Sequence, residues 1–180
     1  LISTMYATTY RLPVCILRCA NLFGGGDLNF SRTIPGVVTA TLKGERFVIP
    51  SDGQFVRDLL YVKDAADAYV LVAERLAEDR RLIGEAFNFG MGLRLTVSSL
   101  VQTVLEMMAR TDLEPIIMNQ ASTEIREQYM CSDKAQKRLG WTPRYDLTNG
   151  LTETIAWYRR RLNLQTAADT EYRTASTLRA

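Results

Sequence analysis

Residues 12–36, LPVCILRCANLFGGGDLNFSRTIPG, join an apolar run to three consecutive glycines and then to the start of a helix. The run over 12–19 has the length and composition of a buried strand. The helix is expected to begin near Ser31 or Thr33, whose hydroxyls can cap it, and to end at Lys43-Gly44. A strand that passes through a loop into a helix is typical of α/β proteins. This stretch therefore indicates an α/β fold.

The rest of the chain continues this alternation. Extended runs are predicted over 45–53, 55–62, 85–90 and 115–118. Each of the next three helices is expected to begin after a residue that can cap it, namely Asp64, Thr96 and Ser132, and the third to end at Gly140. Apolar spacing predicts the buried faces of the helix after Asp64 and of the last helix. These faces are Ala65, Ala68, Tyr69, Val72, Ala73 and Leu76, and Leu151, Thr154, Ile155, Tyr158 and Leu162.

The domain organisation follows from the two ends of the chain. Residues 1–10 resemble the end of a helix, and the sequence lacks an initiator methionine, so we expect it to start within a longer protein. Residues 1–162 are predicted to form one folded unit. After Asn163 the residues become small and polar, which predicts a loose tail over 163–180.

The bulk composition narrows the class of protein. The 180 residues are 47% hydrophobic and 23% charged, as in an ordinary globular domain. A net charge of +2 does not favour nucleic acid or an anionic membrane as partner. The sequence contains neither a membrane-spanning apolar run nor a secretory signal pattern. A cytoplasmic location is therefore expected.

Histidine is absent and there are three cysteines. The lack of histidine removes His-based catalytic triads and most zinc sites, so no metal site is expected. Cys15 and Cys19 fall in one predicted strand, about 13 Å apart. A disulfide needs Cα atoms about 4.4–6.8 Å apart, which predicts that these two remain reduced thiols.

The glycine run Gly24–Gly26 could be a phosphate cradle or a turn. A dinucleotide fingerprint requires the spacing G-x-G-x-x-G between a strand and a helix. These glycines are followed by Asp27, Leu28 and Asn29 and do not have that spacing, and no Walker-type lysine follows. The motif alone favours a turn, in which glycine permits close backbone approach.

Two arginines are candidates for binding an anion. Arg57 stands in the apolar stretch SDGQFVRDLLYVKD (51–64), and its fork-shaped guanidinium suits phosphate oxygens. An ion pair between Arg57 and Asp58, or between Arg57 and another carboxylate, is an alternative of equal weight. Arg126 lies in EIREQYMCSDKAQKRLGWTP (124–143) and could reach an anion, although solvation is favoured. Trp141 in the same stretch is expected to be a packing residue.

Taken together, three stretches resemble the C-terminal half of extended short-chain dehydrogenases/reductases, the NAD-dependent epimerase/dehydratase family. They are LPVCILRCANLFGGGDLNFSRTIPG, SDGQFVRDLLYVKDAADAYVLVAERL and EIREQYMCSDKAQKRLGWTPR. The segment GGGDLNFSR-x-IPG, with ASTEI before QYMCSDKAQKRLGW, is similar to the CDP-glucose 4,6-dehydratases within that family. The resemblance covers residues 1–162.

The resemblance implies a Rossmann-like α/β fold, of which this chain would hold the last sheet strands and the substrate-binding lobe. The expected whole protein is an NAD-dependent, homo-oligomeric lyase that acts on a nucleotide-diphospho-sugar. It would convert CDP-glucose to CDP-4-keto-6-deoxyglucose, a step in the biosynthesis of deoxysugars for polysaccharides. NAD would be held mainly by an N-terminal half.

Residue roles carry over by position. Asn21 and Arg57 match residues that contact the substrate diphosphate, and Arg32 lies near the nucleotide. Phe47 and Ile49 match a strand that lines the base. Where many family members have an arginine for the pyrophosphate this chain has Ala121, and Arg126 is its stand-in.

Cys19 and Ala20 lie where the family's chain passes the nicotinamide. The family's catalytic Ser/Thr and Tyr-x-x-x-Lys have no counterpart in these 180 residues, so no catalytic residue is assigned and the chain alone is expected to be inactive. Two alternatives stay open. The parent could be a dehydratase or epimerase of dTDP-, GDP- or UDP-sugars, or the chain could be a non-catalytic nucleotide-sugar-binding module.

Overall fold

The computed structural model describes residues 2–120 and 125–177, with side chains to residue 163. In chain order the helices are α1 (Ile2–Tyr10), α2 (Thr33–Lys43), α3 (Val62–Glu78), the short 3-10 helix η1 (Arg80–Leu82), α4 (Val97–Met107), α5 (Asp133–Leu139) and α6 (Leu147–Thr177). The strands are β1 (Ile16–Cys19), β2 (Asn21–Phe23), β3 (Val48–Ile49), β4 (Val56–Arg57), β5 (Leu59–Tyr61), β6 (Ala86–Phe89), β7 (Leu95–Thr96), β8 (Ile116–Ile117) and β9 (Glu127–Gln128). This alternation confirms the α/β class.

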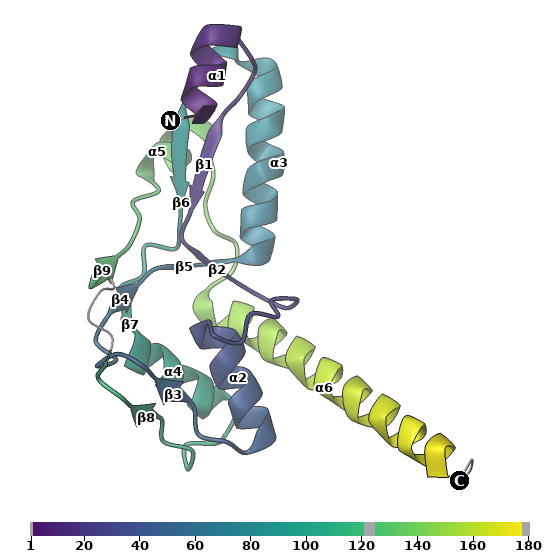
Figure 1. Cartoon of the computed structure of the whole chain (residues 1–180). Coiled ribbons are helices and arrows are strands. Elements are labelled where there is room, and N and C mark those ends of the chain that lie inside the picture. Colours follow the sequence, from purple (N-terminus) through teal and green to yellow (C-terminus); the bar gives the residue numbers. More distant parts are fainter. Residues whose placement is uncertain (1, 121–124, 178–180) are drawn as a thin grey trace.

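The elements form two parts that meet at β2 and β5 (Figure 1). In one part β1 and β6 run parallel, with Ile16 opposite Ala86, between α1, α3 and α5. The other part holds α2, α4 and the small sheets β3–β8 and β7–β4–β9. β2 pairs in parallel with β5, with Asn21 opposite Leu59. The carboxyl end of β1 therefore leads directly into the junction between the parts.

Each part has its own hydrophobic core. One cluster gathers the inner faces of α2, α4 and α6 and includes Val37, Val104 and Leu151. The other lies around β6 and includes Phe89 and Trp141, whose rings meet edge to face with centroids 5.0 Å apart. Trp141 is only 4% exposed, which confirms its predicted packing role.

Helix signals that act within a few residues are confirmed. The Thr96 hydroxyl accepts a hydrogen bond from the Ser99 N–H and caps α4. Gly44 and Gly140 adopt left-handed φ angles of 76° and 73° and end α2 and α5. These positions suit glycine because a Cβ in this region is strained.

The predicted cap of α2 is wrong. The N-cap is Arg32, which makes no side-chain cap hydrogen bond, and Thr33 is already the first helical residue. The Ser31 hydroxyl instead donates to the Asn29 side-chain carbonyl oxygen within the preceding loop. The Ser31 hydroxyl is therefore bonded within the loop and does not cap α2.

Asp64 does not cap α3, which begins two residues earlier at Val62. Ser132 is the N-cap residue of α5, as predicted, but its side chain makes no cap hydrogen bond. The Asp64 carboxylate lies in the first turn of α3 and accepts the main-chain N–H groups of Arg144 and Tyr145. The Ser132 hydroxyl accepts from the Gly90 N–H and donates to the Gly90 carbonyl. Both side chains bind backbone distant in sequence, which local spacing cannot reveal.

The end of the chain is a long helix. Helix α6 spans Leu147–Thr177 and includes the backbone of residues 163–177, which belong to the predicted tail. Leu151, Ile155 and Tyr158 are buried as the apolar spacing predicted. Among the described residues, no helix is long and apolar enough to cross a membrane.

Candidate functional site

A cavity of about 500 Å³ lies where the two parts of the fold meet. It is bounded by β2, the start of α2, the β4–β5 segment and the β7–α4 junction. The lining residues are Ala20, Asn21, Leu22, Phe23, Asp27, Ser31, Arg32, Thr33, Ile34, Pro35, Arg57, Leu59, Leu95, Val97 and Leu100. Four of the eight residues that the sequence assigns to substrate or cofactor, Ala20, Asn21, Arg32 and Arg57, thus share one cavity.

Asn21 is held at the cavity by two bonds to one atom. Its main-chain N–H and its side-chain amide both donate to the Asp58 carbonyl oxygen, each at 3.2 Å. The residue is the first of β2 and is exposed. An amide that is anchored through one of its donors keeps a fixed direction, which suits contact with a ligand.

Arg57 is half-buried at the end of β4. Its guanidinium donates to the carbonyl oxygens of Val56 and Ile125 at 2.9 and 2.8 Å and lies over the Phe55 ring. Asp58, considered above as its ion-pair partner, uses both carboxylate oxygens for backbone N–H groups of other residues. The fork therefore lines the cavity in a fixed orientation.

Arg32 reaches the same cavity from the start of α2 and forms an ion pair with Asp27 at 3.0 Å. The Asp27 side chain is 20% exposed and that of Arg32 is 60% exposed. Sequence reasoning missed Asp27, although an acid five residues before the arginine in a glycine loop was a usable signal. Because the Arg32 side chain is largely exposed, Arg32 can exchange this partner for an anion in solution.

Tyr158 holds the loop that carries Asp27. Its hydroxyl donates to the Asp27 carbonyl oxygen from helix α6. Burial, followed by the charge of Asp27, raises the pKa of Tyr158 to about 12. The phenol therefore stays protonated at neutral pH and remains a hydrogen-bond donor to this loop.

The three glycines have packing roles. A Cβ on Gly24 would lie 2.4 Å from the Val62 side chain, and one on Gly25 would lie 2.5 Å from the Trp157 ring. Gly26 has a φ of +94°, which favours glycine. The run is thus a turn pressed against α3 and α6, and the interpretation as a turn is confirmed.

Three of the predicted substrate-binding residues do not line this cavity, and neither does Cys19. Phe47 lines a separate hollow of about 450 Å³ beside Phe30 and Lys43. Ile49 is fully buried, because strand alternation turns Val48 outward and Ile49 into the core. Arg126 is exposed beside β9, where its carbonyl oxygen accepts the Val56 N–H at 2.7 Å.

Cys19 and Ala20 lie at the carboxyl end of β1, the edge at which α/β proteins bind ligands. The Ala20 N–H donates to the Phe89 carbonyl at 2.8 Å, and Ala20 lines the cavity. Burial raises the pKa of the Cys19 thiol, which favours its protonated form. Cys15, Cys19 and Cys131 are free thiols.

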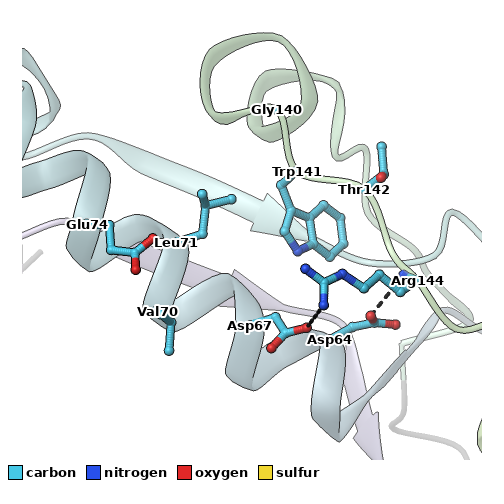
Figure 2. A pocket seen from close by; sticks show the side chains of 9 residues that line it. All are labelled: Asp64, Asp67, Val70, Leu71, Glu74, Gly140, Trp141, Thr142 and Arg144. Atoms are coloured by element: carbon cyan, nitrogen blue, oxygen red, sulfur yellow. Dashed lines mark hydrogen bonds and ion pairs between the residues drawn. The ribbon is translucent and has the colours of Figure 1, made fainter.

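A further hollow, of about 300 Å³, lies between α3 and the segment that follows α5 (Figure 2). There Arg144 pairs with Asp67 at 3.1 Å, and its N–H binds the Asp64 carboxylate beside the Trp141 ring. None of the residues assigned to substrate or cofactor lines this hollow. It is therefore a reference surface outside the cavity.

Comparison with known proteins decides the family. The NAD dependent epimerase/dehydratase family profile matches residues 1–90, half of the chain. The chain belongs to this family. A dTDP-glucose 4,6-dehydratase of Actinoplanes sp. is 30% identical over 159 residues, which are 88% of this chain and 48% of that protein. The Haemophilus influenzae dTDP-glucose 4,6-dehydratase is 28% identical, over 83% of this chain and 46% of the relative.

Solved structures of the family share the fold. The Bacillus anthracis dTDP-glucose 4,6-dehydratase in complex with NAD matches with a TM-score of 0.78 and 28% identity, over 88% of this chain and 48% of that one. The Thermotoga maritima UDP-glucose 4-epimerase with UDP-glucose matches with a TM-score of 0.78 and 30% identity. The match covers 88% of this chain and 50% of the epimerase chain. These matches confirm the extended short-chain dehydrogenase/reductase fold. The chain spans about half the length of the relatives it matches.

Proposed function

We propose that this chain is the nucleotide-sugar-binding part of an NAD-dependent nucleotide-sugar 4,6-dehydratase. The observation that carries the proposal is the convergence of Asn21, Arg32 and Arg57 on one cavity at the junction of the two parts. Two arginines and an anchored amide provide the donors that a diphosphate requires. A cavity of about 500 Å³ is also of ordinary size for a small-molecule site.

In this proposal the residues of the chain bind and orient the substrate. Arg57 presents its fork to the diphosphate oxygens, and Asn21 adds one amide donor beside it. Arg32 leaves Asp27 and turns toward the nucleotide when the anion arrives. NAD, when bound in the whole protein, would supply reversible hydride transfer for the dehydration of the sugar, and Cys19 and Ala20 would lie beside it.

In this chain we assign a contact with NAD only to the residues at the carboxyl end of β1. The 180 residues contain no G-x-G-x-x-G, and the glycines that do occur together pack against Val62 and Trp157. Cys19 and Ala20 would pass the nicotinamide at the end of β1. We therefore assign to this chain a contact with the cofactor, and its main binding site to the remainder of the whole protein.

For the base we propose cytosine, with CDP-glucose as substrate. Support comes from GGGDLNFSR-x-IPG and from ASTEI before QYMCSDKAQKRLGW, which are similar to CDP-glucose 4,6-dehydratases. The segment ASTEI lies largely outside the described residues. dTDP-glucose is the second candidate, favoured by the names of the relatives, and 4-epimerisation of a UDP-sugar is the third, favoured by the Thermotoga structure.

Calorimetric titration of the chain with CDP-, dTDP- and UDP-glucose tests the proposal. We expect binding of nucleotide sugars, with the lowest Kd for CDP-glucose, and no binding of glucose alone. A lower Kd for dTDP- or UDP-glucose would contradict the choice of base but keep the site. Absence of binding by all three would contradict the proposed function. In the whole protein, a product that lacks one water relative to substrate separates dehydration from epimerisation.

A further inference from the structure

Asp58 carries a buried carboxylate close to the cavity. Its side chain does not line the cavity itself. It stands between β4 and β5, next to Arg57, and is 1% exposed. Its Oδ1 accepts the N–H groups of Leu59 and Leu93 at 2.8 and 2.9 Å. Its Oδ2 accepts those of Gly92 and Met130 at 3.3 and 3.2 Å. A carboxylate has about four lone-pair positions, and all four are used here.

The four donors come from three separate segments of the chain. Leu59 begins β5, Gly92 and Leu93 follow β6, and Met130 lies between β9 and α5. Gly90 makes the arrangement possible, because a Cβ at this position would lie 2.3 Å from Asp58 Oδ2. The carboxylate therefore joins loops from both parts of the fold at one point.

The main chain of Asp58 also forms hydrogen bonds, including two with Asn21, which lines the cavity. Its carbonyl oxygen accepts both the N–H and the side-chain amide of Asn21. Its N–H donates to the Gln128 carbonyl at 2.9 Å. The same residue thus fixes the Asn21 amide on one side and the backbone that carries Arg57 on the other.

We propose that Asp58 is a positioning residue for nucleotide-sugar binding, which sets the placement of Asn21 and Arg57 through its buried carboxylate. The inference rests on the proposed function of the cavity. It adds a residue that touches no ligand yet controls affinity, because a shift of about 0.5 Å in the binding groups is enough to weaken a site.

Asp58→Asn is the test, since it keeps the size of the side chain and turns one acceptor into a donor that faces N–H groups. Asp64→Asn is the matched control. Asp64 is also 1% exposed and accepts two backbone N–H groups, but it lines the hollow in Figure 2 and not the cavity. Kd for CDP-glucose and Tm are measured for both variants and the parent, at a temperature where all three are folded.

We expect both variants to have a lower Tm, and only Asp58→Asn to have a Kd raised by roughly tenfold or more. A parent-like Kd in Asp58→Asn together with a lowered Tm would show a purely structural role and overturn the inference. If Asp58→Asn does not fold, Gly90→Ala displaces the same carboxylate by contact, and a parent-like Kd there overturns the inference in the same way. Absence of binding by the parent would instead refute the proposed function.

Discussion

Replacing Arg57 with alanine is expected to raise the Kd for the nucleotide sugar roughly 10- to 100-fold. A hydrogen bond to a charged group contributes about 1.5–3 kcal/mol, and the guanidinium is the half-buried cation of the cavity. Its orientation is fixed by the carbonyl oxygens of Val56 and Ile125, so little side-chain entropy is lost on binding. Calorimetric titration with CDP-glucose measures the effect.

Arg75→Ala is the matched control for this substitution. Arg75 is an exposed arginine on α3 that pairs with Glu78 at 3.1 Å, outside the cavity. We expect it to bind with the Kd of the parent. Arg57→Lys should recover only part of the affinity, because an ammonium is a point charge without the fork. Equal Kd values for the parent and Arg57→Ala would contradict the assigned role.

Replacing Phe89 with alanine is expected to lower the free energy of unfolding by about 3–5 kcal/mol. The Phe89 side chain is fully buried in β6 and meets the edge of Trp141. Its removal would leave a cavity in the cluster that joins β6 to α3 and α5. Urea unfolding followed by Trp fluorescence measures the loss.

Tyr69→Ala serves as the control for Phe89→Ala. Apolar spacing placed Tyr69 on the buried face of α3, but the side chain is 56% exposed, so that prediction is wrong. We expect its loss to change the free energy of unfolding by less than about 0.5 kcal/mol. If Phe89→Ala also changed the free energy of unfolding by less than about 0.5 kcal/mol, the hydrophobic cluster around β6 would not be a stabilising core.

Predictions from sequence succeeded where the cause lies within a few residues. Thr96 caps α4 through an N–H three positions away, and Gly44 ends α2 by its own backbone angle. Asp64 and Ser132 also stand near helix starts, but their partners are the backbone at 144–145 and at Gly90. A short polar side chain serves either purpose, and only the tertiary arrangement decides between them.

The same distinction applies to the candidate site. Asn21 and Arg57 were predicted because each lies in a motif that resembles one of the family, and the structure brings them to one cavity. Asp58 was considered only as a partner of Arg57, because three of its four donors are 34 to 72 residues away along the chain. Ile49 was assigned to the base, yet the two-residue periodicity of β3 turns it into the core.

We propose that the cavity between β2, α2 and β4 binds a nucleotide sugar. Titration of the ¹⁵N-labelled chain with CDP-glucose, followed by amide NMR spectra, tests this most directly because it locates the ligand. We expect the largest shifts on Asn21, on residues 31–34 and on Arg57. Shifts that gather instead around the hollow at Trp141, or spectra unchanged by excess ligand, would contradict it.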